Sequence, residues 1–239
     1  MITGILVALP EELRTLTKSK IQQGECFAMS ENTLITLTGS GPKNAANGAQ
    51  NLLAQGATQL ISWGCAGALA PYLNAGDLLI PDSVLTRDNT LVATHKLWSQ
   101  QVIALLDSSI TYTESKLLES DTIISLAQDK NQQYLQTQAV AVDMESAAVA
   151  RFANQQQIPF IAIRSIVDPA ALDLPKAIDY AMNDKGVVSI SKLLLFLCRH
   201  PGDLPSLIKL GLHFNAASKT LKHLAHQLPQ ITQTQWSVA

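Results

Sequence analysis

Short apolar runs alternate with helix-length segments over the first two thirds of the chain. The runs have the length of strands and are Ile2–Leu9, Thr33–Thr38, Gln59–Gly64, Asp77–Pro81, Ala139–Val142 and Pro159–Val167. Apolar strands that alternate with helices are typical of a largely parallel sheet with helices on both faces. The pattern therefore predicts an α/β fold, and the length of 239 residues fits one large domain over 1–239.

Two of the intervening segments have helical periodicity. In Pro42–Gln55 the proline suits a first turn, and small or apolar side chains recur at helical spacing, namely Ala45, Ala46, Ala49, Leu52 and Leu53. The segment Asp143–Gln156 repeats the pattern, with Met144, Ala147, Ala148 and Phe152 on one face. Both segments are predicted to pack on the sheet as helices.

The C-terminal third differs in character from the rest of the chain. Its pattern predicts a helix over Asp184–Cys198, a helical extension over about residues 200–228 and a polar, poorly ordered tail over 229–239. Leucines and lysines are interleaved in the extension, which leaves two interpretations open. It packs on the sheet as an amphipathic helix, or it forms a surface for a partner or for peripheral contact with a membrane.

Composition narrows the class of protein. Apolar residues make up 47% of the chain and charged residues 15%, below the usual figure of about 25%, so part of the surface is predicted to be covered by a partner or a lipid. The net charge of −2, without a basic block, argues against a nucleic-acid partner. Three scattered cysteines favour neither a disulfide framework nor a zinc site. With no apolar run long enough to span a bilayer and no signal-like N-terminus, we expect a cytoplasmic protein.

Polar or small residues follow five of the predicted strands. These segments are Pro10-Glu11-Glu12, Gly39-Ser40-Gly41, Gly64-Cys65-Ala66-Gly67, Asp143-Met144-Glu145 and Asp168-Pro169. Functional groups of open α/β sheets gather at the carboxyl ends of strands. Each segment also has a purely structural interpretation, because acidic residues cap helices and glycines make tight turns. Three carboxylates at the ends of different strands favour a catalytic site.

At these segments the chain resembles the nucleoside phosphorylase and nucleosidase superfamily, in particular the branch that contains methylthioadenosine/S-adenosylhomocysteine nucleosidase. The matching pieces occur in the family's order and cover most of residues 2–170. They are Gly4–Leu13, Ser40–Ala46, Gly64–Leu69 with Gly76–Leu78, Ala141–Ala148 and Ile163–Ala170. The resemblance implies a three-layer αβα sandwich with a mixed, largely parallel central sheet, a homodimer or larger assembly, and no cofactor or metal.

The resemblance also implies a role for each carboxylate. Adenine leaves readily only when it is protonated, and the ribose passes through an oxocarbenium-like state. Asp168 matches the acid that shares a proton with purine N7, Glu145 the carboxylate that holds the ribose hydroxyls, and Glu12 the residue that orients the attacking water. The implied substrate contacts come from Met144, Asp143, Cys65, Ala66, Gly67, Ile123 and Ile124.

Departures from the family pattern bear on the substrate. Asp143 stands where the family usually has Glu, Cys65 replaces a commoner Ser, and aliphatic Ile123 replaces a stacking aromatic residue. The segment between Asp77 and Ser120 is shorter than is typical. This shortening and the apolar C-terminal extension are similar to the hopanoid-associated phosphorylases, which implies a lipid nucleoside such as adenosylhopane as a candidate substrate.

The nucleophile can be water or phosphate. Phosphorolysis needs fixed cations, preferably arginines, and the strand Leu60–Trp63 lacks the arginine of the family's phosphorylases. Arg14, Lys43 and Arg87 remain candidate anchors, but Glu12 favours water, so hydrolysis is the prediction. A non-catalytic nucleoside-binding protein is the rival. A dinucleotide-dependent oxidoreductase is excluded, because no GxGxxG opens the first helix.

Overall fold

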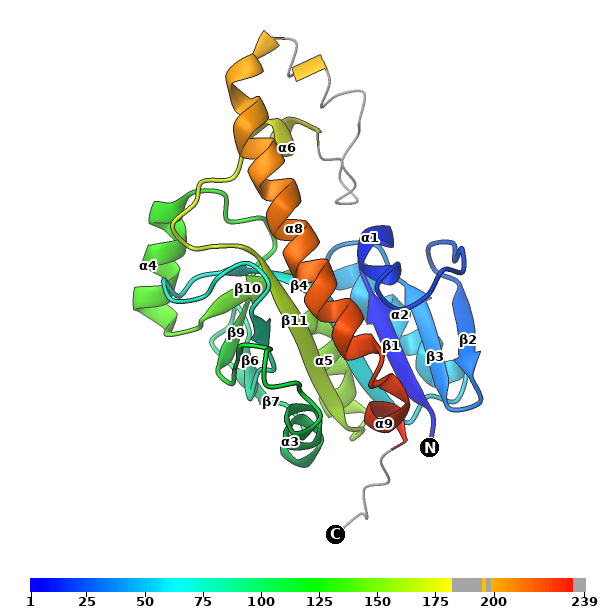
Figure 1. Ribbon diagram of the computed structural model, residues 1–239. Coiled ribbons are helices and arrows are strands. Elements are labelled where there is room, and N and C mark those ends of the chain that lie inside the picture. The colour runs from blue at the N-terminus through cyan, green and yellow to red at the C-terminus, as the bar shows by residue number, and fades with distance from the viewer. Residues whose placement is uncertain (182–194, 197–198, 234–239) are drawn as a thin grey trace.

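The computed structural model describes residues 1–181, 195–196 and 199–233, and it has the predicted α/β architecture (Figure 1). All six predicted apolar runs overlap a strand, and both periodic segments contain a helix. The strands are β1 (Thr3–Val7), β2 (Cys26–Ser30), β3 (Thr33–Leu37), β4 (Gln59–Ala68), β5 (Leu78–Leu79), β6 (Ser83–Leu85), β7 (Leu91–Ala93), β8 (Tyr112–Thr113), β9 (Lys116–Glu119), β10 (Ala141–Asp143) and β11 (Phe160–Asp168). The helices are α1 (Pro10–Leu13), α2 (Pro42–Ala54), α3 (Lys96–Ala104), α4 (Ala127–Thr137), α5 (Ser146–Gln155), α6 (Lys176–Ala181), α8 (Leu204–Ala225) and α9 (Leu228–Thr232).

Strand β4 is the centre of the sheet. It pairs in parallel with β1 on one side and with β11 on the other, so that Trp63 stands between Val7 and Ile163. Its carboxyl end also pairs with β10 in the antiparallel sense, where Gly67 lies opposite Val142. Parallel pairs join β1 to β3, β9 to β10 and β6 to β9, whereas β2 and β7 are antiparallel to their neighbours. The sheet is therefore mixed, as the resemblance implied.

Side chains along the central strands point alternately to the two faces of the sheet, and this divides the core into two layers. On β4, Leu60 packs into a cluster with α2 and α5, whereas Ile61 and Trp63 pack into a second cluster with α3, α8 and α9. Helix α8 crosses one face of the sheet, and α2 and α5 lie behind it (Figure 1). Because successive side chains of a strand point to opposite faces, both faces of β4 need a covering layer. The result is the predicted three-layer sandwich.

Helix α8 differs along its length. Its second half packs on the sheet through Ala217, Leu221 and Leu224, which are at most 1% exposed. Its first half extends beyond the sheet (Figure 1). On that half Leu204, Ile208 and Leu212 are exposed, at a spacing of four residues. Of the two interpretations of the extension, packing on the sheet therefore applies to the second half of α8 and not to the first. The predicted helix over Asp184–Cys198 lies almost entirely outside the described residues, and among those that are described no helix is long and apolar enough to cross a membrane.

The prediction of a poorly ordered tail from residue 229 is wrong for its first part. Residues Leu228–Thr232 form α9, in which Ile231 is fully buried. The indole N–H of Trp98 donates to the Ile231 carbonyl at 2.9 Å, and the Thr3 hydroxyl donates to the Thr232 carbonyl at 3.1 Å. The polar composition concealed this element, because two apolar side chains, Leu228 and Ile231, and two carbonyl contacts are enough to dock it.

The docking of α9 predicts a measurable contribution to stability. Ile231→Ala should lower the free energy of unfolding by about 2–5 kcal/mol, because it removes a fully buried side chain and leaves a cavity. Urea denaturation followed by circular dichroism measures the loss. Leu212→Ala is the control, since that side chain is 63% exposed, and it should change stability by less than about 0.5 kcal/mol. Equal losses in the two variants would contradict the docking of α9.

Candidate active site

The ends of four strands meet around the last residues of β4. The parallel strands β1, β4 and β11 end on the same side of the sheet, and β10 reaches that place from the opposite direction. Glu12 follows β1 on α1, Glu145 follows β10, and Asp168 ends β11 opposite Gly67 of β4. The fold therefore places the three predicted catalytic carboxylates around the segment Cys65–Gly67.

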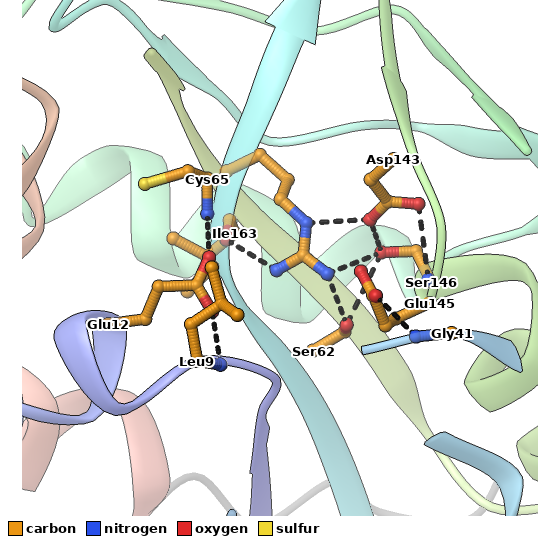
Figure 2. A network of polar contacts seen from close by, with 10 residues as sticks. Leu9, Glu12, Gly41, Ser62, Cys65, Asp143, Glu145, Ser146 and Ile163 are labelled. Carbon is orange, nitrogen blue, oxygen red and sulfur yellow. Dashed lines mark hydrogen bonds and ion pairs between the residues drawn. The ribbon is translucent and has the colours of Figure 1, made fainter. Parts of the chain in front are cut away.

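Glu12 is held by backbone donors from two elements. One oxygen, Oε1, accepts from the Cys65 N–H at 2.7 Å, and Oε2 accepts from the Leu9 N–H at 3.0 Å (Figure 2). A Cβ at Gly64 would lie only 2.5 Å from Oε1, so glycine is required there for the carboxylate to approach β4. Burial raises the pKa of Glu12, and the nearby Arg164 guanidinium counteracts the rise. A carboxyl of this kind can take a proton from water.

Arg164 is a buried cation next to these carboxylates, and the sequence alone gave no role for it. It lies on β11 and is only 3% exposed. Its Nε donates to Asp143 Oδ2 at 2.7 Å, and its Nη2 donates to the hydroxyls of Ser62 at 2.6 Å and Ser146 at 3.0 Å. Asp143, predicted as a substrate contact, is thus committed to this cation. In the sequence Asp143 directly follows an apolar run, and nothing in that pattern indicates that its partner lies on another strand.

Glu145 lies on the other side of this network from Glu12 (Figure 2). Its Oε1 accepts from the Gly41 N–H at 2.8 Å, and Gly41 has a φ of +95°, which favours glycine. Loss of hydration on burial, together with the like charge of Asp143, raises the pKa of Glu145 to about 7. Within the Gly39–Gly41 segment, the backbone of Gly41 therefore holds this carboxylate. Met144, which is predicted to pack against the sugar, is half-buried.

Asp168 has a buried cationic partner that sequence reasoning missed. Its Oδ2 lies 2.6 Å from Lys130 Nζ, and the two side chains are 9% and 1% exposed. Burial raises the pKa of Asp168, as the acid role requires, and Lys130 opposes the rise. Helix α4 is polar along most of its length, and Lys130 is its one buried residue. The composition of the segment therefore gave no signal for this contact.

The remaining predicted site residues have no described contact with the three carboxylates. Ile124 packs against the apolar cluster that contains Leu118 and Val142, and Ile123 is half-buried in the loop between β9 and α4. This loop is tied to the loop after Asp168, because Leu174 N–H donates to the Ser125 carbonyl at 2.8 Å. Ala66 is buried in the core beneath the site. The described contacts do not join either isoleucine to Asp168.

The Cys65 side chain is unsuited to nucleophilic attack. Burial and the adjacent Glu12 carboxylate raise the pKa of its thiol well above the usual range. Thiolate, rather than thiol, is the reactive form. Its contribution here is the backbone N–H that holds Glu12.

The candidate phosphate anchors lie elsewhere or are already paired. Arg14 has a side chain that is 72% exposed, and Lys43 is also exposed. Arg87 forms an ion pair with Asp121, beside a bidentate pair between Arg151 and Glu119. In the part of the chain that the structure describes, no cluster of histidine, cysteine or acidic residues could hold a metal ion.

Comparison with known proteins assigns the family. The family model described as the phosphorylase superfamily matches residues 3–192. A 5'-methylthioadenosine/S-adenosylhomocysteine nucleosidase from Baumannia cicadellinicola is 29% identical over 199 residues, which cover 71% of this chain and 87% of that protein. A nucleosidase of the same name from Staphylococcus aureus is 27% identical over 219 residues, covering 79% and 95%. The chain belongs to the phosphorylase superfamily, which confirms the resemblance.

Solved structures share the fold. The nucleosidase of Neisseria meningitidis in complex with methylthio-immucillin-A superposes with a TM-score of 0.71 and 17% identity, over 96% of this chain and 99% of that one. Futalosine hydrolase from Helicobacter pylori superposes with a TM-score of 0.70 and 16% identity, over 95% and 97%. At these identities the likeness extends to the fold and not to the substrate.

The buried Arg164 network predicts a large loss of stability when its cation is removed. Arg164→Met should lower the free energy of unfolding by about 3–5 kcal/mol, because Asp143 is left charged and without its partner in the core. Arg87→Met breaks the exposed pair with Asp121 and should cost at most about 1 kcal/mol. Thermal and urea denaturation compare the two. A loss at Arg164 no greater than that at Arg87 would show that the network does not stabilise the fold.

Proposed function

We propose that this protein hydrolyses the N-glycosidic bond of a purine nucleoside and releases adenine. The observation that carries the proposal is the convergence of Glu12, Glu145 and Asp168, from three different elements, on the carboxyl end of β4. Membership of the phosphorylase superfamily, together with relatives named as nucleosidases, supports the same chemistry.

Each carboxylate has a part in the proposed reaction. Asp168 gives its proton to purine N7 as the C1′–N9 bond breaks and its electron pair passes to the base. Glu145 accepts hydrogen bonds from the ribose hydroxyls, with Met144 packed beside the sugar. Glu12 orients a water molecule and takes its proton as the oxygen attacks C1′. These roles follow from the family resemblance and agree with the burial and raised pKa of all three groups.

Charge at the Glu12 end of the site favours water over phosphate. A phosphate dianion needs cations that are free to bind it. The guanidinium whose charge acts on Glu12 is that of Arg164, which is hydrogen-bonded to Asp143, Ser62 and Ser146. Glu12 itself would repel phosphate. A phosphorylase remains the alternative within the same family, and it would have to recruit Arg14, Lys43 or Arg87.

The nucleophile is tested by leaving phosphate out. Wild-type protein should release adenine at its full rate in phosphate-free buffer, and Glu12→Gln should lower kcat by about 10²–10⁴-fold, because the water loses its base. Chromatography of the products distinguishes a free sugar from a sugar 1-phosphate. Glu11→Gln is the matched control, since Glu11 is an exposed neighbour on the same helix, and it should retain the wild-type rate. A strict phosphate requirement would refute hydrolysis.

A non-catalytic nucleoside-binding protein is the rival from another class. It would bind a nucleoside without releasing base. A base-release assay on the wild-type protein separates the two cases, and in an enzyme Asp168→Asn should lower that release by about 10²–10⁴-fold.

The finer proposal concerns the 5′ substituent, which we infer to be an apolar chain of lipid length that contacts the exposed half of α8. Leu204, Ile208 and Leu212 are 49%, 57% and 63% exposed, and Leu207 is half-buried on the same half-helix. An apolar stripe of this kind supports contact with an alkyl chain, as in a lipid nucleoside such as adenosylhopane.

The preference for 5′ substituents tests this finer proposal. Long 5′-alkyl adenosines should have a higher kcat/KM than adenosine, because each buried methylene contributes about 0.8 kcal/mol. The double variant Leu207→Ser, Leu212→Ser should lose the preference. Leu97 is an exposed leucine on α3, and the control variant Leu97→Ser should keep the preference. Equal kcat/KM for hydroxyl, methylthio and long alkyl substrates would exclude a lipid nucleoside and leave the nucleosidase proposal intact.

Three further expectations stay predictions. They are a homodimer or larger assembly in which a neighbouring subunit closes the 5′ end of the site, peripheral contact of the C-terminal helices with a membrane, and a cytoplasmic location. The exposed stripe on α8 is compatible with either kind of contact.

A further inference from the structure

Lys130 is buried in a way that is unusual for a lysine. Its exposed fraction is zero, although it belongs to the mostly polar helix α4. Lysine is almost never fully buried unless it is paired. Its Nζ lies 2.6 Å from Asp168 Oδ2, and it donates to the carbonyls of Leu172 at 2.7 Å and Pro169 at 3.4 Å. Three acceptors around one nitrogen match the three donors of an ammonium group.

The contact involves the carboxyl that the proposed reaction requires as its acid. Burial raises the pKa of Asp168, Lys130 lowers it, and Asp173 raises it slightly through its like charge. Asp173 itself accepts from the Ala127 N–H at the start of α4, at 2.7 Å, and Asp129 on α4 is exposed to solvent. Lys130 is therefore the cation that opposes the effect of burial on Asp168.

We propose that Lys130 is a positioning residue that holds Asp168 through Oδ2 and leaves the other carboxyl oxygen to face the purine. This inference rests on the proposed function. When Asp168 gives its proton to N7, the carboxylate that remains lies against the Lys130 ammonium and is stabilised by it. Without this cation a buried carboxyl would hold its proton too firmly, and it would be a weaker acid towards the base.

A purely structural role for Lys130 has a different signature. Lys130 also ties α4 to the loop after β11 through the Leu172 and Pro169 carbonyls. If that tie were its whole contribution, a substitution would lower stability, or would lower activity by one factor at every pH. A residue that acts through Asp168 must instead change the pH at which activity is lost.

The pH profile of kcat/KM for adenine release distinguishes the two roles. Activity should fall as the pH rises through the pKa of Asp168, since the acid must be protonated. Removing the positive charge in Lys130→Met raises that pKa, so the alkaline limb should move up by about one pH unit or more. The rate below the limb should fall by about 10-fold or more, because the acid is weaker. Lys130→Arg keeps a positive charge and should keep the wild-type limb.

A folded Lys130→Met protein with the wild-type limb, or with a uniform loss at every pH, would overturn the inference. If that variant does not fold, infrared difference spectra of wild-type protein against Asp168→Asn decide the matter. The Asp168 carboxylate band should appear between about pH 5 and about pH 9, because Lys130 counteracts the rise that burial causes in the pKa of this carboxyl. A carboxyl that stays protonated from about pH 5 to about pH 9 would overturn the inference. Absence of base release by wild-type protein from any purine nucleoside would instead refute the proposed function, and the infrared result would still test the pair.

Discussion

The buried guanidinium of Arg164 is the interaction on which the site depends. It lies within the sheet, where an unpaired charge would be very unfavourable, and its hydrogen bonds reach β10, β4 and the start of α5. These elements also carry the residues that surround the proposed substrate. The contact of Arg164 with Asp143 therefore fixes where β10 ends, and with it the position of Glu145 two residues later. Stability of the core and geometry of the site have a common origin here.

Charge in the site is divided between two groups. In one, Arg164 acts on three carboxylates, those of Asp143, Glu12 and Glu145. Burial raises the pKa values of Glu12 and Glu145, and the single guanidinium counteracts the rise only in part. In the other group, the ammonium of Lys130 is paired with the carboxylate of Asp168. Glu12 and Asp168 thus lie in different charge environments. This difference fits the roles of base and acid that are proposed for them.

The last helices show how one apolar pattern can have two outcomes. Leucines recur through α8 at helical spacing, but only its second half meets the sheet. The first half presents the same kind of stripe to solvent. Periodicity marks a face that can be buried and does not say what buries it. The short helix α9 is the opposite case, because it is docked by a tryptophan and a threonine that lie far away in the sequence.

The sequence by itself determined the α/β class, the six main strands, the helices α2 and α5, and the strand ends at which Glu12, Glu145 and Asp168 lie, because local periodicity and chain order carry that information. It did not determine the short elements between residues 83 and 137, where the apolar runs are too brief to be distinctive. The partners of the charged groups were also beyond its reach. Arg164 meets Asp143 across 21 positions, and Lys130 meets Asp168 across 38. Such pairings depend on strand order and on which side of a helix faces the core, and only the tertiary structure decides these.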